Sequence, residues 1–224
     1  MDKENKLFSK IFLEKRDCES DWFILRSKEL VDIARKHKSL SALVYSAFEA
    51  RNAVEQIWFE LIEACYKGEI PQEILIECRK TNGIFQVMQV TEPDYRKLMK
   101  FCSICRSIDT EMPVVIQWDL RKLRRFWNQL SNYCHSPMSA KDTYESPEWF
   151  KKGVLLVNEV YDYMSTEMKR AGSKGGTGRI DHKSMPEEVK QAWEAFKSDS
   201  ISENQLYRRL KIMFPVLQMR TGRL

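Results

Sequence analysis

The sequence predicts an all-α fold: an up-and-down helical bundle with a small helical C-terminal appendage. Glycine and proline, which both disfavour helix interiors, are scarce, at 8 and 7 of 224 residues. Apolar residues recur at spacings of three and four through several long segments, as they do on the buried face of a helix. Residues typical of helix starts and stops separate those segments. Apart from residues 112–117, no stretch shows the alternation of a strand.

Hydrophobic residues make up 43% of the chain, which is enough for a sizeable core. The longest apolar runs have about five residues, far fewer than the ~20 of a membrane-spanning helix. The first ten residues, MDKENKLFSK, are charged and lack the apolar centre of a signal peptide. We therefore expect a cytoplasmic protein that does not contact a membrane.

The first expected helix covers residues 21–37, with Ser20 as its cap, after a charged lead at residues 1–17. The longest expected helix follows at residues 41–66, and Lys67-Gly68 stops it. A third helix is predicted at 71–89, with an interruption at 81–83. The capping pattern Thr91-x-x-Asp94 then predicts a fourth helix that runs to about Ile108.

Arg51 and Glu55 stand one turn apart at the edge of the apolar stripe of helix 41–66. They are spaced to form an ion pair, in the weaker of the two orders. Charged pairs at the edge of a core are more often structural than catalytic, but perturbed pairs also mark active sites. Both roles therefore stay open for Arg51.

The helix expected at residues 114–135 has two opposed faces. Its apolar residues, at spacings of four and three, are Ile116, Leu120, Leu123, Trp127, Leu130 and Cys134. Its polar residues keep the same spacing about half a turn away, and they are Arg121, Arg125, Asn128, Asn132 and His135. Pro137 ends the helix, so that His135 lies in the last turn, where the helix dipole favours the charged imidazolium. The polar stripe is either a solvated face or a ligand-binding surface.

Ser146-Pro147-Glu148 is a typical helix start, and it opens a last long helix at residues 147–170. Four of the eight glycines lie within seven residues of the next segment, which is typical of a flexible tether. We therefore divide the chain into a helical bundle at 1–170, a tether at 171–183 and an appendage at 184–224.

Capping-box patterns at Ser184 and Ser202 predict two short helices in the appendage, at 186–197 and 203–213. Two helices of this length make a poor core of their own. We expect the appendage to dock on the bundle, on a second subunit or on a partner. Residues 169–224 carry twelve Lys/Arg and six Asp/Glu, so the net charge of +5 comes from this end of the chain. Such a bias suits a nucleic acid or an acidic protein.

Most of the six cysteines fall on or near predicted apolar helix faces, which is typical of reduced core thiols. A zinc site built from Cys102, Cys105, Cys134 and His135 is the less favoured interpretation, because the Cys-x-x-Cys pair has no second pair at zinc-ribbon spacing. We expect neither a metal nor another cofactor.

Two segments carry a resemblance to a known family: AFEARNAVEQIWFELIE in helix 41–66 and LSNYCHSP at the end of helix 114–135. Together with the helical order, they resemble HEPN-domain proteins of prokaryotes over about residues 20–170. The resemblance implies an up-and-down helical bundle that forms a homodimer. Many HEPN proteins cleave RNA without a metal, through an arginine followed after four to six residues by a histidine. Several act in toxin–antitoxin, abortive-infection and CRISPR systems.

The sequence departs from that motif. Counting back from His135, the positions that the family pattern allows for arginine hold Asn128, Gln129 and Leu130. Arg125 lies ten residues from His135, about 15 Å along a helix axis. The missing arginine argues against retained catalysis. The polar stripe, in contrast, lies where the resemblance to HEPN proteins places the active site.

The resemblance carries over His135 as a catalytic residue, with Asn128 as an imperfect polar stand-in and Arg51 as a substitute cation. In an active enzyme, the histidine would transfer the proton of the 2′-hydroxyl reaction, and the cation would stabilise the phosphorane charge. The expected nucleic-acid-binding residues are Arg121, Arg125 and Asn132.

We predict a HEPN-like helical module of a prokaryotic antiviral-defence or toxin-type system. It would act by binding RNA or a protein partner from a defence complex. One alternative is a metal-free ribonuclease that uses His135, and another is a helical adaptor unrelated to HEPN proteins.

Overall fold

The computed structural model describes residues 19–66, 69–109, 114–134, 146–170 and 185–220, the last five of these by backbone alone. Within these residues the chain forms helices joined by short connections, and no strand is present. The prediction of an all-α helical bundle is confirmed. None of the described helices is long and apolar enough to cross a membrane. The tether at 171–183, His135 and the charged lead at 1–17 lie outside the described residues.

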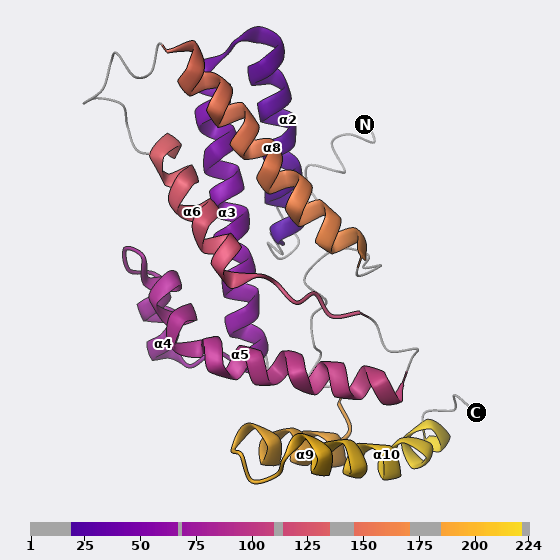
Figure 1. Cartoon of the computed structure of the whole chain (residues 1–224). Coiled ribbons are helices and arrows are strands. Elements are labelled where there is room, and N and C mark those ends of the chain that lie inside the picture. The colour runs from indigo at the N-terminus through magenta and orange to yellow at the C-terminus, as the bar shows by residue number, and fades with distance from the viewer. Residues whose placement is uncertain (1–18, 67–68, 110–113, 135–145, 171–184, 221–224) are drawn as a thin grey trace, which may run out of the picture.

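Helix α3 (Leu40–Cys65) forms the centre of the bundle, with α2, α6 and α8 packed along it in Figure 1. Its Ser39 cap accepts a hydrogen bond from the Ala42 N–H, at 3.3 Å. Helix α2 (Ser20–His37) packs so closely on α3 that Ser27 and Ser46 donate their hydroxyls to each other's carbonyl oxygens, at 2.9 and 3.0 Å. These paired groups leave no buried hydroxyl unsatisfied at that crossing.

The next pair of helices differs from the sequence prediction. Helix α4 covers Gln72–Cys78, and α5 covers Gly83–Ile108 without a break near residue 90. Asn82, at φ 58°, separates the two helices. Pro93 lies inside α5, where it removes one backbone hydrogen bond, but buried residues on both sides of it hold the helix against the bundle. Thr91 is not a cap, because its hydroxyl donates to the Val87 carbonyl at 2.8 Å.

The predicted helix 114–135 is also wrong at its start. Helix α6 covers Leu120–Cys134, and residues 114–119 are not helical. Asp119 begins the helix, because its Oδ1 accepts hydrogen bonds from the backbone N–H groups of Arg121 and Lys122, both at 3.0 Å. The backbone N–H of Trp118 donates to the Tyr95 hydroxyl, at 2.9 Å. This hydrogen bond fixes the non-helical residues 114–119 on α5. With 26 residues, α5 rather than α6 matches α3 in length.

Helix α8 (Pro147–Arg170) packs against α2, α3 and α6 and closes the bundle. Gly153 allows its close approach. A Cβ at this position would lie 2.6 Å from Tyr133 Cε1 and 2.9 Å from Leu43 Cδ2. We expect Gly153→Ala to destabilise the protein by about 1 kcal/mol: overpacking costs ~1–3 kcal/mol, and the gain in helix propensity returns about 1 kcal/mol. Urea denaturation of both proteins measures the difference, and a stabilised variant would contradict the packing.

The appendage docks on α5. Helix α9 covers Glu187–Lys197, and α10 covers Glu203–Arg220, so it continues through Pro215 instead of ending near residue 213 as the sequence predicts. Ser202 and Gln205 form the expected capping box, with hydrogen bonds of 2.8 and 3.4 Å. Figure 1 shows both helices along the side of α5 that faces away from the bundle.

Candidate nucleic-acid interface

Helix α6 presents one polar and one apolar face, and the structure assigns the sequence-predicted residues to them. The exposed positions include Arg121, Arg125, Asn128 and Asn132. The buried positions are Leu123, Phe126, Trp127, Leu130 and Tyr133. The polar stripe therefore faces solvent over the whole of α6. His135, which would continue it, lies outside the described residues.

The exposed side of α6 is strongly basic at its N-terminal half. Arg121, Lys122, Arg124 and Arg125, here called the basic ridge, lie within five positions, and α6 contains no acidic residue. Arg125 forms an ion pair with Glu159 of α8 at 2.8 Å, but both side chains are about half exposed, so solvent screens the pair strongly. The ridge therefore keeps most of its positive field.

Three of these cations lie over aromatic rings, and Arg125 is one of them, with its guanidinium 5.2 Å from the centre of the Phe126 ring. The Lys122 ammonium lies 4.1 Å from the centre of the Tyr163 ring, and the Arg124 guanidinium lies 4.7 Å from the centre of the Phe85 ring. Cations over aromatic faces are attracted by the ring quadrupole. Each of these contacts restricts the rotamers of the cationic side chain.

A cluster around Arg51 lies between α3 and the C-terminal half of α6. Its guanidinium lies 4.8 Å from the centre of the Trp127 ring, and its Nε is 3.1 Å from Glu55 Oε1. The Trp127 indole N–H donates to the same carboxylate oxygen at 2.7 Å. The buried Arg51 Nε–H makes no well-aligned hydrogen bond, although it is close to Glu55. Glu55 thus holds Arg51 and Trp127 together across the two helices.

Arg51 also reaches the C-terminal end of α6. Burial raises the pKa of the Cys134 thiol to about 11, although the charge of Arg51 and a hydrogen bond from it oppose that shift. The thiol is therefore neutral at physiological pH and is an unreactive neighbour. Cys134 immediately precedes His135, the predicted catalytic residue, in the sequence.

The structure joins only some of the predicted site residues. Arg51 contacts Trp127 and Cys134, whereas Asn128 is exposed on α6 and has no described contact with Arg51. Sequence analysis missed Lys122 and Arg124, which lie beside the stripe and not on it. The signal that identifies them is the density of basic residues in 121–125, not their helical spacing.

The cysteines of the less favoured zinc interpretation are buried or half-buried thiols. Burial raises the pKa of Cys102 and that of Cys105 to about 12, so both are protonated at physiological pH. The described residues hold no group of three or more His, Cys, Asp or Glu side chains placed to bind a metal ion, although His135 is outside that search.

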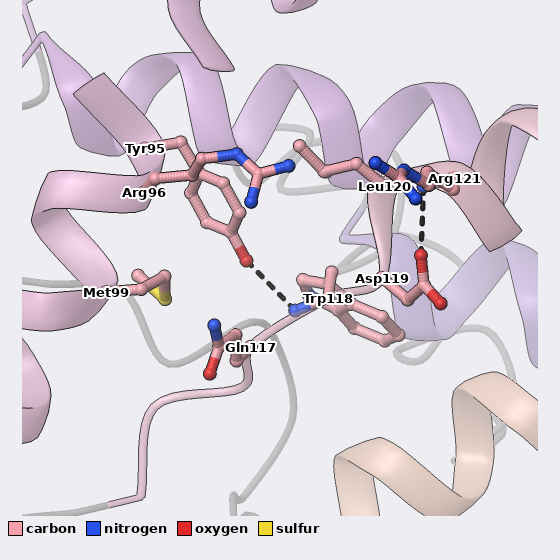
Figure 2. Close-up of a pocket in the computed structure, with 8 residues that line it drawn as sticks. All are labelled: Tyr95, Arg96, Met99, Gln117, Trp118, Asp119, Leu120 and Arg121. Carbon is pink, nitrogen blue, oxygen red and sulfur yellow. Dashed lines mark hydrogen bonds between the residues drawn. The ribbon is translucent and has the colours of Figure 1, made fainter. Parts of the chain in front are cut away.

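A second feature, an open hollow of about 520 Å³, lies where the N-terminal end of α6 meets α5. Figure 2 shows the side chains that line it, and they are Tyr95, Arg96, Met99, Gln117, Trp118, Asp119, Leu120 and Arg121. Arg121 belongs both to this hollow and to the basic ridge. The two features are therefore neighbours on one surface.

No family model, curated protein or solved structure matches this chain. The features of the chain that bear on its function are therefore the charges, exposures and contacts of the basic ridge, the Arg51 cluster and the hollow.

Proposed function

We propose that this chain binds RNA through the basic ridge of α6, as a HEPN-like helical module of a prokaryotic defence or toxin-type system. The observation that carries the proposal is the ridge itself: four Lys/Arg within five positions of a helix without acidic residues. Phosphate groups dominate the affinity of proteins for nucleic acids, and clustered Lys/Arg on one exposed helix face suit them.

Side chains of the basic ridge are partly ordered for contacts with phosphate before a ligand binds. Tyr163 and Phe85 hold Lys122 and Arg124 in place before any ligand arrives, so less side-chain freedom is lost on binding. Asn128 and Asn132 extend the face toward the end of α6. Amide side chains also hydrogen-bond to phosphate and sugar oxygens, although without sequence information.

A metal-free ribonuclease is the second candidate, and the Arg51 cluster is the observation that favours it. Its guanidinium lies beside Cys134, the residue before His135. In this alternative, Arg51 stabilises the charge of the phosphorane while His135 transfers the proton. The ion pair between Arg51 and Glu55 weighs against the ribonuclease, because the carboxylate offsets the positive charge of Arg51 that the reaction needs.

Replacing Arg124 and Arg125 together by Gln is expected to weaken RNA binding at least tenfold at low salt. Two lost phosphate contacts also reduce the slope of log K against log salt by about 1.4 for a single strand. Fluorescence anisotropy of a labelled single-stranded RNA, titrated at several salt concentrations, measures both quantities.

The matched control is the double substitution of Arg26 and Arg35 by Gln. Both are exposed arginines of α2 that pair with an acidic residue on the same helix, and their loss changes the net charge equally. An equal loss of affinity in this control would assign binding to overall charge. No binding of RNA by the wild-type protein would reject the proposal and leave the ridge as a surface for a protein partner.

A further inference from the structure

The hollow between α5 and α6 has the volume of a small-ligand site and a lining that is mainly polar. Its volume of about 520 Å³ lies in the ~300–1,000 Å³ range of typical ligand sites. Met99 and Leu120 contribute apolar surface, and the remaining lining residues contribute polar or aromatic groups. Figure 2 shows Arg96 and Tyr95 on one side and the segment Gln117–Asp119 on the other.

Two guanidiniums line the hollow with unused hydrogen-bonding capacity. Arg96 binds the Glu92 carboxylate through Nε and Nη2, which leaves three of its five N–H donors. The Arg121 guanidinium has no ion-pair partner among the described residues. Both arginines line the same hollow from different helices, and guanidinium donors suit planar or tetrahedral anions.

The neutral groups of the hollow are also mainly donors. Tyr95 is almost fully buried, and its hydroxyl oxygen accepts a hydrogen bond from the backbone N–H of Trp118. The hydrogen of the Tyr95 hydroxyl has no acceptor among the described residues. Burial raises the pKa of Tyr95 well above its usual range, which keeps the phenol protonated. The carboxylate in the lining, Asp119, is committed to the cap of α6 through Oδ1.

We propose that this hollow binds a phosphate monoester, either on a small phosphorylated sugar or at the terminus of an RNA strand. A monoester carries about −1.5 to −2 charges at pH 7 and three strong acceptor oxygens, which match the two guanidiniums and the Tyr95 hydroxyl. Met99 and Leu120 take the carbon part of the ligand. The hollow and the basic ridge share Arg121, but they can be tested separately, because Arg96 and Tyr95 lie on α5 and the Arg124/Arg125 variant leaves Arg121 in place.

The first test uses ribose 5-phosphate, with ribose and inorganic phosphate for comparison, in calorimetric titrations of the full chain. We expect saturable binding of ribose 5-phosphate and at least tenfold weaker binding by Arg96→Gln. Glu92→Gln should tighten binding several-fold, because the carboxylate no longer competes for Arg96. Arg26→Gln, which removes an exposed arginine paired on its own helix, should change nothing. Lowering the pH from about 7 to 5 should weaken binding, as the phosphate loses its second charge near pH ~6.

A second arm separates the two sources of the phosphate. RNAs of one sequence with a 5′-phosphate, a 3′-phosphate or hydroxyls at both ends are compared by anisotropy. A preference for one phosphorylated end that Arg96→Gln removes, and that the Arg124/Arg125 double variant keeps, assigns the hollow to an RNA terminus. Saturable binding of ribose 5-phosphate without such a preference assigns it to a small molecule. Failure of both arms, or equal binding by Arg96→Gln, overturns the proposal, whether or not the ridge binds RNA.

Discussion

Replacing Trp193 by Ala is expected to release the α9–α10 pair from α5. Trp193 is 1% exposed and packs against Phe101 of α5, with ring centres 5.2 Å apart. Truncating a buried tryptophan costs about 3–5 kcal/mol. Two short helices contribute little stability of their own once they lose their packing surface. Hydrogen exchange should therefore become fast throughout residues 187–210, while the protected amides of α3 stay slow.

Ion pairs also cross this junction, but they are too weak to hold it. Lys97 contacts Asp199 at 2.6 Å, and Lys100 contacts Glu203 at 3.0 Å, and these side chains are partly to largely exposed. Lys197 contacts Asp94 of α5 at 2.8 Å. Pairs of this kind contribute about 0.2–1 kcal/mol each, so the three together stay below the contribution of Trp193. They set the orientation of the appendage more than its affinity.

Trp22→Ala is the control for that experiment. Trp22 is a tryptophan of the same size, but 44% of it is exposed on α2, so the substitution should cost far less and leave the exchange of the appendage unchanged. Unchanged protection in Trp193→Ala would show that other contacts hold the appendage. Loss of protection in α3 as well would show that the appendage is part of the cooperative core.

Local sequence signals predict the helices well where packing agrees with them. The start of the helix at residue 147 and the capping box at Ser202 both appear as expected. The same signals predict the wrong helix boundaries where contacts between distant parts of the chain determine the conformation. Pro93 looks like a helix start, yet its neighbours in α5 are buried on one face and keep the helix continuous. The run before Asp119 has helical spacing, yet a hydrogen bond to the distant Tyr95 holds it in a different conformation.

The candidate sites also differ in whether the sequence alone predicts them. The polar stripe of α6 lies within one helix, so its spacing predicts its exposed face. The hollow is invisible to that reasoning, because Tyr95 and Arg96 come from α5 and Gln117 and Arg121 from a segment some twenty residues later. The contact between Arg51 and Trp127 joins positions 76 residues apart. The sequence indicates Arg51 as a charged residue at a core edge but cannot identify its partner.

We expect the wild-type protein to bind RNA in the presence of EDTA without cleaving it. Arg51, the substitute cation that the resemblance carries over, is mostly buried and paired with Glu55. The Arg51 side chain therefore cannot readily move to stabilise the charge that develops on a reacting phosphate. Cleavage by the wild type that His135→Ala abolishes would instead establish the ribonuclease alternative.

Asn128→Arg is the variant with the largest expected gain. It places an arginine on an exposed position of α6 with six residues between it and His135, which is a spacing that the HEPN resemblance implies for active enzymes. We expect metal-independent RNA cleavage by this variant, and its loss when His135→Ala is added. Asn132→Arg adds the same charge to the same face outside that spacing, so it should strengthen RNA binding without cleavage. If Asn128→Arg binds RNA more tightly but leaves it intact, a HEPN-like active site around His135 is rejected, and RNA binding by the basic ridge stands without it.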